Sequence, residues 1–243
     1  MGRLLKSDHG TGEIIVDILA AIDGTMTHGD VAWSHLPFGF GKPLLDHPGG
    51  NTTNSHVYDF YRRFNTMGGR KEYFEGPAIA GEDVGRIKRE VVFFVKNEVL
   101  EKPDARIVLV GWSRGGHIAI EVARELKGKR EVYFLGLYDA VDKTFELDRW
   151  DVPFGPSRQI ENTLFAFHAV RSLLRMDRVW MGHAGVRKSP GVRYEELECD
   201  TTHGAIGGIL PNGKTFQDRL DCMWGQKAHE WILENARKLR LHV

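Results

Sequence analysis

The chain alternates between short apolar runs and longer segments whose apolar residues recur at helical spacing. The apolar runs predict strands at 13–22, 71–74, 106–111 and 131–138, and a weaker signal predicts another at 192–198. Apolar residues on one face predict helices at about 55–66, 82–100, 115–127, 159–174 and 224–240. Strands that alternate with amphipathic helices are typical of βαβ units. We therefore expect one α/β domain over residues 1–243, with a mostly parallel central sheet and helices on both faces.

Residues 26–52 interrupt this alternation, because they combine Gly, Pro, His and Asn without any period. A long loop inside a compact domain is usually functional or mobile. This loop carries four large apolar residues, Trp33, Phe38, Phe40 and Leu44. It is therefore a candidate wall or lid for a binding site. Asn54 follows the loop as a candidate N-cap of the next helix.

The composition is that of a folded globular protein, with 42% hydrophobic and 27% charged residues among 243. Lys plus Arg and Asp plus Glu are both 33, so the formal net charge is zero. This balance disfavours a nucleic-acid-binding protein that relies on global charge. Cys199 and Cys222 have neither the number nor the spacing of a disulfide framework or a metal site, which favours a reducing compartment.

The first residues, MGRLLKSDHGTGE, lack the apolar core of a secretory signal. Nowhere does the sequence contain the run of about 18 apolar residues that a membrane-spanning helix needs. We expect no transmembrane segment, and a cytoplasmic location or secretion by a route without a Sec signal peptide. Peripheral contact with a membrane is left open.

The pentad Gly111-Trp-Ser-Arg-Gly115 fits the G-x-S-x-G pattern of a nucleophile elbow. It lies between a predicted strand and a predicted helix, which is the context that the motif requires. The flanking glycines relieve crowding around a strained serine, and the helix that follows directs backbone N–H groups at the site. Ser113 is therefore our candidate nucleophile.

A serine nucleophile needs a base, and the base needs a carboxylate that orients it. Asp139 directly ends the strand after the elbow, with Asp142 as a close alternative. His203 lies in a Gly-rich segment between the last predicted strand and the last helix, and His183 has a similar setting. Asp200 is an alternative partner for His203.

The tripeptide Asp23-Gly24-Thr25 ends the first strand, so it should lie on the same edge of the sheet as Ser113. In this type of site one oxyanion donor follows the nucleophile and another comes from an early loop. We therefore nominate the backbone N–H groups of Arg114 and of Thr25, with Gly24 as the alternative.

Several separated motifs together resemble the α/β-hydrolase catalytic domain of type VI secretion phospholipase effectors. In chain order they are Asp23-Gly-Thr25, Asn51-Thr-Thr-Asn-Ser-His-Val-Tyr, Tyr73-Phe-Glu-Gly-Pro, Ala80-Gly81, Gly111-Trp-Ser-Arg-Gly115, Gly136-Leu-Tyr-Asp-Ala-Val141, His168-Ala169 and His203-Gly-Ala-Ile-Gly-Gly208. The order and rough spacing agree over about residues 14–210. The sequence departs from the family pattern at Met26, where an aromatic is usual, and at Ala205, where the family has an acidic residue.

The resemblance implies an α/β-hydrolase-like fold with a Ser113–Asp139–His203 triad. It also implies ester hydrolysis, with lipid acyl esters as the substrate class. We hypothesise a serine ester hydrolase that needs no metal or organic cofactor. One alternative is an esterase or thioesterase that acts on small molecules without a lipid preference. Another is a hydrolase-like fold that only binds a partner, in which the elbow is inert.

Overall fold

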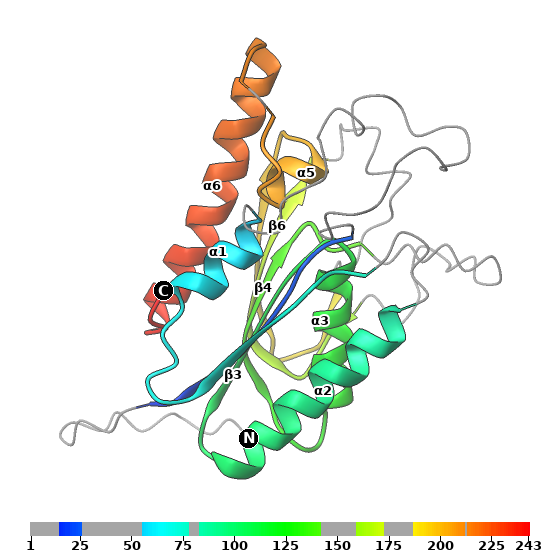
Figure 1. Cartoon of the computed structure of the whole chain (residues 1–243), viewed down its shortest axis with the longest axis vertical. Helices are drawn as coiled ribbons and strands as arrows, with labels where there is room; N and C mark the ends of the chain where they lie inside the picture. Colours follow the sequence, from blue (N-terminus) through cyan, green and yellow to red (C-terminus); the bar gives the residue numbers. More distant parts are fainter. Residues whose placement is uncertain (1–14, 26–54, 78–82, 142–158, 173–186, 212) are drawn as a thin grey trace.

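Figure 1 presents a computed structural model of the chain, which describes residues 15–25, 55–77, 83–141, 159–172, 187–211 and 213–243. Within these residues, six strands form one sheet in the order β2-β1-β3-β4-β6-β8, and every neighbouring pair is parallel. The strands are β1 (Asp17–Ile22), β2 (Arg70–Phe74), β3 (Arg106–Trp112), β4 (Val132–Tyr138), β6 (Thr163–Arg171) and β8 (Arg193–Cys199). The short strands β5 (Gln159–Ile160) and β7 (Arg187–Lys188) form a separate parallel pair.

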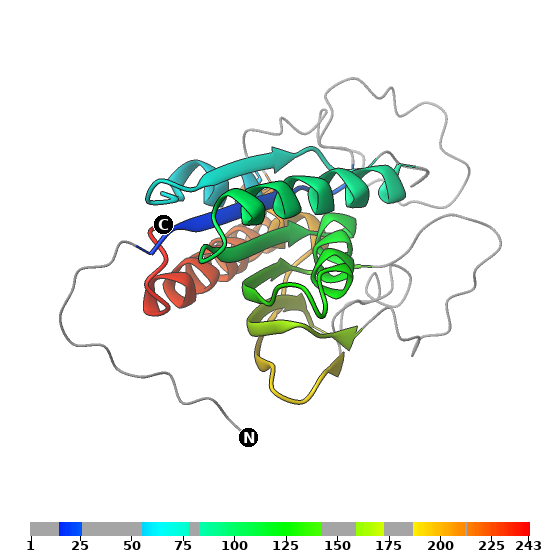
Figure 2. The ribbon, with the colours of Figure 1, turned by 90° about the horizontal axis from the view of Figure 1, so that it is seen from below.

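Helices cover both faces of this sheet (Figures 1 and 2). The described helices are α1 (His56–Arg63), α2 (Val84–Glu101), α3 (Arg114–Glu125), α5 (His203–Ile206) and α6 (Phe216–Lys238). One core cluster joins the sheet to α2 and α3, and a second joins the opposite face to α1 and α6. The predicted α/β-hydrolase-like architecture, a mostly parallel sheet with helices on both faces, is therefore confirmed.

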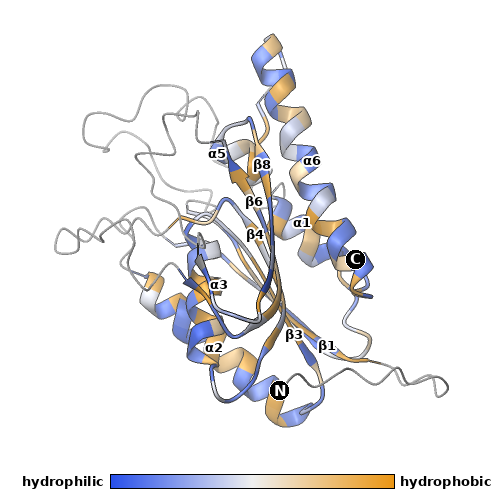
Figure 3. Cartoon of the chain, turned by 180° about the vertical axis from the view of Figure 1, so that it is seen from behind, coloured by the Kyte–Doolittle hydropathy of each residue, from blue (hydrophilic) through white to orange (hydrophobic). Residues whose placement is uncertain are grey.

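The two clusters explain why the strands read as unbroken apolar runs. Successive side chains of a strand point to opposite faces, so a strand with a helix layer on each side buries all of them. In β1, Ile18 belongs to the α2/α3 cluster and Leu19 to the α1/α6 cluster, and every residue of the strand is buried. Figure 3 shows the apolar residues concentrated where helices meet the sheet.

The helix predicted at 159–174 is wrong, because the described part of this segment forms β5 and β6 instead. Ile160, Leu164, Phe167 and Leu174 share helical spacing by coincidence. β6 pairs with β4 on one side and β8 on the other, and Ala166–Arg171 are buried throughout. A short apolar run that is buried on both faces cannot be told from a buried helix by periodicity.

The helix ends also differ from the predicted ones. The N-cap of α1 is Ser55, whose hydroxyl accepts the N–H of Tyr58 at 3.0 Å, whereas Asn54 lies outside the described residues. α6 begins at Phe216, earlier than predicted, behind a capping box formed by Thr215 and Asp218. Its first turns are largely exposed, so they carry no apolar stripe that would reveal a helix. The predicted loop around His203 contains the short helix α5.

Close packing between β1 and the first turn of α3 leaves no room for a side chain at Gly115. A Cβ there would lie 2.2 Å from the carbonyl oxygen of Asp23 and 2.4 Å from that of Ile22. We expect Gly115→Ala to lower the free energy of unfolding by about 1–3 kcal/mol, because backbone must shift to admit the methyl group. Urea unfolding of the variant and the wild type measures the difference.

Gly85→Ala is the matched control. Gly85 lies in the first turns of α2, where an added Cβ would meet only the end of the Arg89 side chain, at 3.6 Å. Alanine favours a helix over glycine, so this variant should be as stable as the wild type or slightly more stable. Equal stability of the two variants would contradict the packing argument.

Candidate active site

The candidate groups gather at one edge of the sheet because adjacent parallel strands end there together. Ser113 follows β3, Asp139 follows β4, and these strands pair in register up to Trp112 and Tyr138. Asp23 follows β1, which pairs with β3 on the side away from β4. Arg171 is the last residue of β6, the neighbour of β4. The carboxyl ends of parallel strands are where open α/β sheets build their sites.

Ser113 has the strained backbone that an elbow requires. Its φ is 56° and its ψ is −130°, values that non-glycine residues rarely adopt. The turn is held by two hydrogen bonds, from the N–H of Ser113 to the carbonyl of Tyr138 and from the N–H of Val141 to the carbonyl of Ser113. The neighbouring structure thus fixes a costly conformation that lifts the serine side chain off the sheet.

A chain of hydrogen bonds links the three nominated side chains. Ser113 Oγ lies 2.8 Å from His203 Nε2, and His203 Nδ1 lies 2.7 Å from Asp139 Oδ2. An ionised carboxylate only accepts, so Nδ1 carries the proton of a neutral imidazole and Nε2 accepts the serine hydroxyl. This tautomer leaves Nε2 ready to take the hydroxyl proton.

Asp139 is completely buried, with a positive φ of 44°. Besides His203, it is bound by Arg171, whose backbone N–H donates to Oδ1 at 3.2 Å and whose Nε donates to Oδ2. Burial raises the pKa of Asp139, but the hydrogen bond and charge of His203, with the charge of Arg171, hold that pKa well below its ordinary value. Asp139 is therefore a carboxylate.

His203 opens α5, which α1 and α6 hold in place. The hydroxyl of Thr202 caps α5 by accepting the N–H of Ala205. Thr201 Oγ1 donates to Asp221 Oδ1 of α6 at 2.9 Å. His56 of α1 donates its backbone N–H to Gly207 and lies with Nδ1 2.9 Å from the carbonyl of Ile206. These contacts fix the segment that carries the imidazole.

The tripeptide Asp23-Gly24-Thr25 is anchored by its aspartate. Asp23 Oδ2 accepts hydrogen bonds from the hydroxyls of Ser55 and Tyr73, both at 2.5 Å, and Oδ1 accepts the N–H of Gly24 at 2.7 Å. Burial raises the pKa of Asp23 to about 6. Because the Gly24 N–H already donates to Asp23, Thr25 is the better oxyanion candidate of this loop. Arg114 reaches the same loop, since its Nε donates to Thr25 Oγ1 at 2.6 Å.

Trp112, the second residue of the elbow pentad, was missed by the sequence reasoning. Its ring centroid lies 5.5 Å from that of His203. A Cβ on Gly24 would come within 2.4 Å of the indole, and one on Gly207 within 2.0 Å. The indole therefore packs between the Asp23 loop and the His203 segment, and glycine is required on both sides.

A second buried polar network lies behind the site, between the sheet, α1 and α6. Tyr138 hydroxyl and His229 Nδ1 are 2.8 Å apart, and His229 Nε2 lies 2.8 Å from Asp59 Oδ2. The ring of His56 stacks on that of His229 with centroids 4.4 Å apart. Burial lowers the pKa of His56 to about 3 and also lowers the pKa of His229.

None of the remaining nominated residues that the structure describes joins the chain of hydrogen bonds at Ser113. Asp200 is exposed, and the Nδ1 that it was nominated to orient is bound by Asp139 instead. His183 and Asp142 lie outside the described residues, as does the loop at 26–52. His168 is buried in β6, where its Nε2 accepts the N–H of Ala140 at 3.0 Å.

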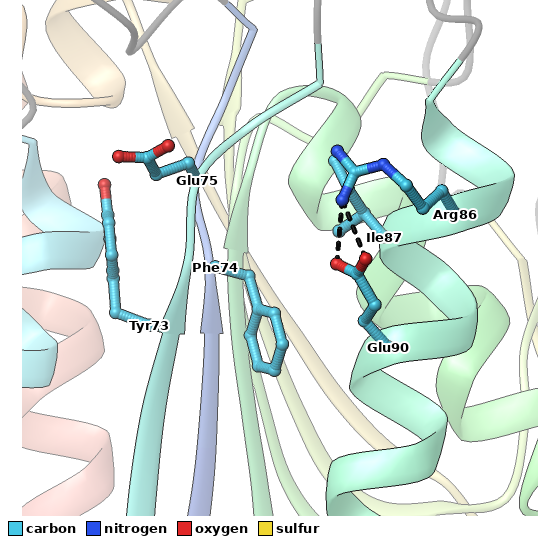
Figure 4. A pocket seen from close by; sticks show the side chains of 6 residues that line it. All are labelled: Tyr73, Phe74, Glu75, Arg86, Ile87 and Glu90. Carbon is cyan, nitrogen blue, oxygen red and sulfur yellow. Dashed lines mark hydrogen bonds and ion pairs between the residues drawn. The ribbon is translucent and has the colours of Figure 1, made fainter.

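A cavity of about 380 Å³ lies beside β2 and the start of α2 (Figure 4). It is lined by Tyr73, Phe74, Glu75, Arg86, Ile87 and Glu90. Arg86 and Glu90 form an ion pair on its α2 side, and none of the nominated catalytic residues lines it. This cavity is separate from the chain of hydrogen bonds at Ser113.

The described residues offer neither an evident metal site nor a membrane-spanning helix. No group of three or more His, Cys, Asp or Glu side chains in them is arranged to hold a metal ion. None of the described helices combines the length and the apolar character needed to cross a bilayer.

No family model matches the sequence, and no curated protein does. Among solved structures, the chain is similar to an uncharacterized protein from Pseudomonas aeruginosa, with 13% identity and a TM-score of 0.40 over 88% of this chain. It spans 46% of that protein, less than half. A cutinase-like protein from Cryptococcus sp. has 9% identity and a TM-score of 0.39, over 93% of this chain and 97% of the other. The NocB thioesterase domain, in a covalent complex with a fluorophosphonate nocardicin G analog, has 13% identity and a TM-score of 0.40, over 88% and 94%. At these scores, none of the three carries an argument about the chemistry of this chain.

The buried His56 makes stability depend on pH. Its pKa is about 3 in the folded protein and about 6.5 in the unfolded chain, so the unfolded chain binds more protons between these values. The contribution of a neutral His56 is present above about pH 6.5 and is lost as pH falls toward 3. Between pH 7.5 and 5 it should decrease by about 2 kcal/mol. Asp23 acts in the opposite sense, because its raised pKa favours the folded state as it protonates.

His56→Gln separates the two effects, because glutamine keeps an N–H donor for Ile206 but does not titrate. We expect urea unfolding at pH 7.5 and 5 to show a smaller loss of stability, or a larger gain, in the variant than in the wild type. The same pH dependence in both proteins would contradict the assignment to His56.

Proposed function

We propose that the protein is a serine hydrolase that cleaves carboxylic esters, with Ser113 as nucleophile, His203 as base and Asp139 as the carboxylate that orients the base. The observation that carries this proposal is the continuous hydrogen-bond chain from Ser113 Oγ through His203 to Asp139. It is supported by the strained backbone of Ser113 between β3 and α3. A capping serine would have no need of such a conformation or of such partners.

In the first half-reaction, Ser113 Oγ attacks the acyl carbonyl carbon while His203 Nε2 takes the hydroxyl proton. Asp139 accepts the Nδ1 hydrogen bond and stabilises the imidazolium that forms. When the tetrahedral intermediate collapses, the bond to the alcohol oxygen breaks and His203 returns the proton to that oxygen. The alcohol leaves, and the acyl group remains on Ser113.

Water completes the cycle by the same steps. His203 removes a proton from the water, the oxygen attacks the acyl carbonyl, and the proton passes to Ser113 Oγ as the acid departs. The negative oxygen of each intermediate is assigned to the backbone N–H groups of Arg114 and Thr25. Arg114 is the first residue of α3, at the positive end of the helix dipole, which favours that charge.

For the substrate, we propose the acyl esters of lipids. This choice rests on the ordered motifs that resemble the phospholipase effector domains, from Asp23-Gly-Thr25 to His203-Gly-Ala-Ile-Gly-Gly208. Small-molecule esters and thioesters share the same acyl chemistry, so they are the competing outcome of a substrate panel.

Ser113→Ala should abolish both labelling by a fluorophosphonate probe and turnover of a p-nitrophenyl ester, because the atom that attacks is gone. The expected loss in turnover is at least about 10³-fold, as for other hydrolytic triads. Ser189→Ala, which removes a hydroxyl that accepts a hydrogen bond from the Gln159 side chain, is the matched control and should keep wild-type labelling. Normal turnover by folded Ser113→Ala would falsify the mechanism.

The base is tested by substituting His203 and His183 separately with Gln. His203→Gln should lose activity to the same extent as Ser113→Ala, since the nucleophile then lacks its proton acceptor. His183→Gln should retain activity. The opposite result would assign the base to His183 and remove His203 from the mechanism.

The substrate class is tested by comparing rates on short-chain p-nitrophenyl esters, an acyl thioester, monomeric phospholipid and phospholipid vesicles. We expect kcat/KM to rise with acyl-chain length, and release of fatty acid from phospholipid by the wild type but not by Ser113→Ala. Rates confined to short esters would reject the lipid preference while leaving the serine mechanism intact.

A further inference from the structure

Arg171 is a completely buried cation in direct contact with the nominated carboxylate. Its side chain and that of Asp139 both have no exposed area. Its Nε donates to Oδ2, the same oxygen that accepts His203 Nδ1, and its backbone N–H donates to Oδ1. Burying an unpaired ion costs free energy, so the folded state depends on this contact.

We propose that Arg171 is a positioning residue that aligns the Asp139 carboxylate for His203 and offsets its charge, so that the Ser113–His203 pair stays active at lower pH. This inference rests on the proposed function and extends it to a residue outside the three nominated ones. The alignment follows from the two donors of Arg171, which together fix both oxygens of the carboxylate.

The Arg171 guanidinium also offsets the negative charge that His203 faces. A lone buried carboxylate beside His203 would strongly favour the protonated imidazole, which cannot accept the serine proton. With Arg171 against that carboxylate, His203 faces an ion pair whose net charge is zero. Removing the Arg171 charge would leave the carboxylate uncompensated and would favour the imidazolium, which cannot act as the base.

The other groups around the pair do not supply this charge balance. Burial raises the pKa of the Cys199 thiol to about 12, so it is neutral. His168 Nε2 accepts the N–H of Ala140, which requires that nitrogen to be unprotonated. The Arg114 side chain on α3 donates to Thr25, and the Asp23 carboxylate accepts the hydroxyls of Ser55 and Tyr73. Among the described residues, Arg171 is the cation that contacts Asp139.

The test separates charge from alignment. Arg171→Met removes the charge and the side-chain donor to Oδ2, Arg171→Gln removes the charge but keeps a side-chain hydrogen-bond donor, and Arg171→Lys keeps the charge on a different geometry. The backbone N–H that donates to Oδ1 is present in all three variants. Arg193→Met, at an exposed arginine on the neighbouring strand β8, is the matched control. For each folded variant, the rate of Ser113 labelling by the fluorophosphonate is measured from pH 4.5 to 9, with Ser113→Ala as the blank.

We expect the acid limb of the labelling profile to move up by about one pH unit in Arg171→Met and Arg171→Gln. In Arg171→Lys the limb should stay at its wild-type position, while the plateau rate falls about tenfold because the carboxylate is less well aligned. Arg193→Met should match the wild type throughout. Circular dichroism at each pH shows that the compared proteins are folded, and Arg171→Gln answers the charge question if Arg171→Met does not fold.

Two results would overturn the inference while leaving the proposed function in place. One is an acid limb that coincides in wild type, Arg171→Met and Arg171→Gln, and the other is a full plateau rate in Arg171→Lys. A folded wild type that is not labelled at Ser113 would instead overturn the proposed function, and the role of Arg171 with it.

Discussion

The parallel pairing of β1, β3, β4 and β6 is the constraint on which the candidate site depends. Because these strands run in one direction and pair in register, the residues that follow them meet at one edge. Asp23, Ser113 and Asp139 each follow a strand end directly, and no long loop is needed to bring them together. His203 follows the end of β8 less directly, since it opens α5 after a short connection, and α1 and α6 anchor this segment.

This edge of the sheet buries several charged side chains close together, and each of them needs polar partners nearby. Asp23, Asp139 and Arg171 are fully buried, and each takes part in at least two hydrogen bonds with neighbouring elements or loops. An unpaired buried charge costs several kcal/mol, so the contacts of each group are conditions for folding as well as for geometry. Such satisfied networks specify one arrangement and resist alternatives. The contacts that make burial of these charges possible therefore also fix the positions of the side chains at the site.

The sequence was sufficient to predict what local patterns encode. The alternation of strands and helices, the elbow at Ser113 and the aspartate at the end of β4 each have a signature within a few residues. β6 was mistaken for a helix because a strand buried on both faces has no period of its own. Asp139 contacts Arg171, and Trp112 packs against Gly24 and Gly207. These residues are far apart in the chain, so no local motif predicts their contacts. Their partners are decided by strand order, which local patterns do not contain.

The buried histidines and the buried ion pair have opposite relations to pH. His56 and His229 are stacked and desolvated, which lowers the pKa of both, so acid works against the packing that holds α5. The Asp139–Arg171 pair has already exchanged its hydration for internal partners, and the low pKa of Asp139 keeps it charged in mild acid. In mild acid, therefore, the support behind the site weakens before the ion pair does. On lowering the pH, we therefore expect the site to be affected first through the α1–α6 network that anchors His203, and only at lower pH through the Asp139–Arg171 pair.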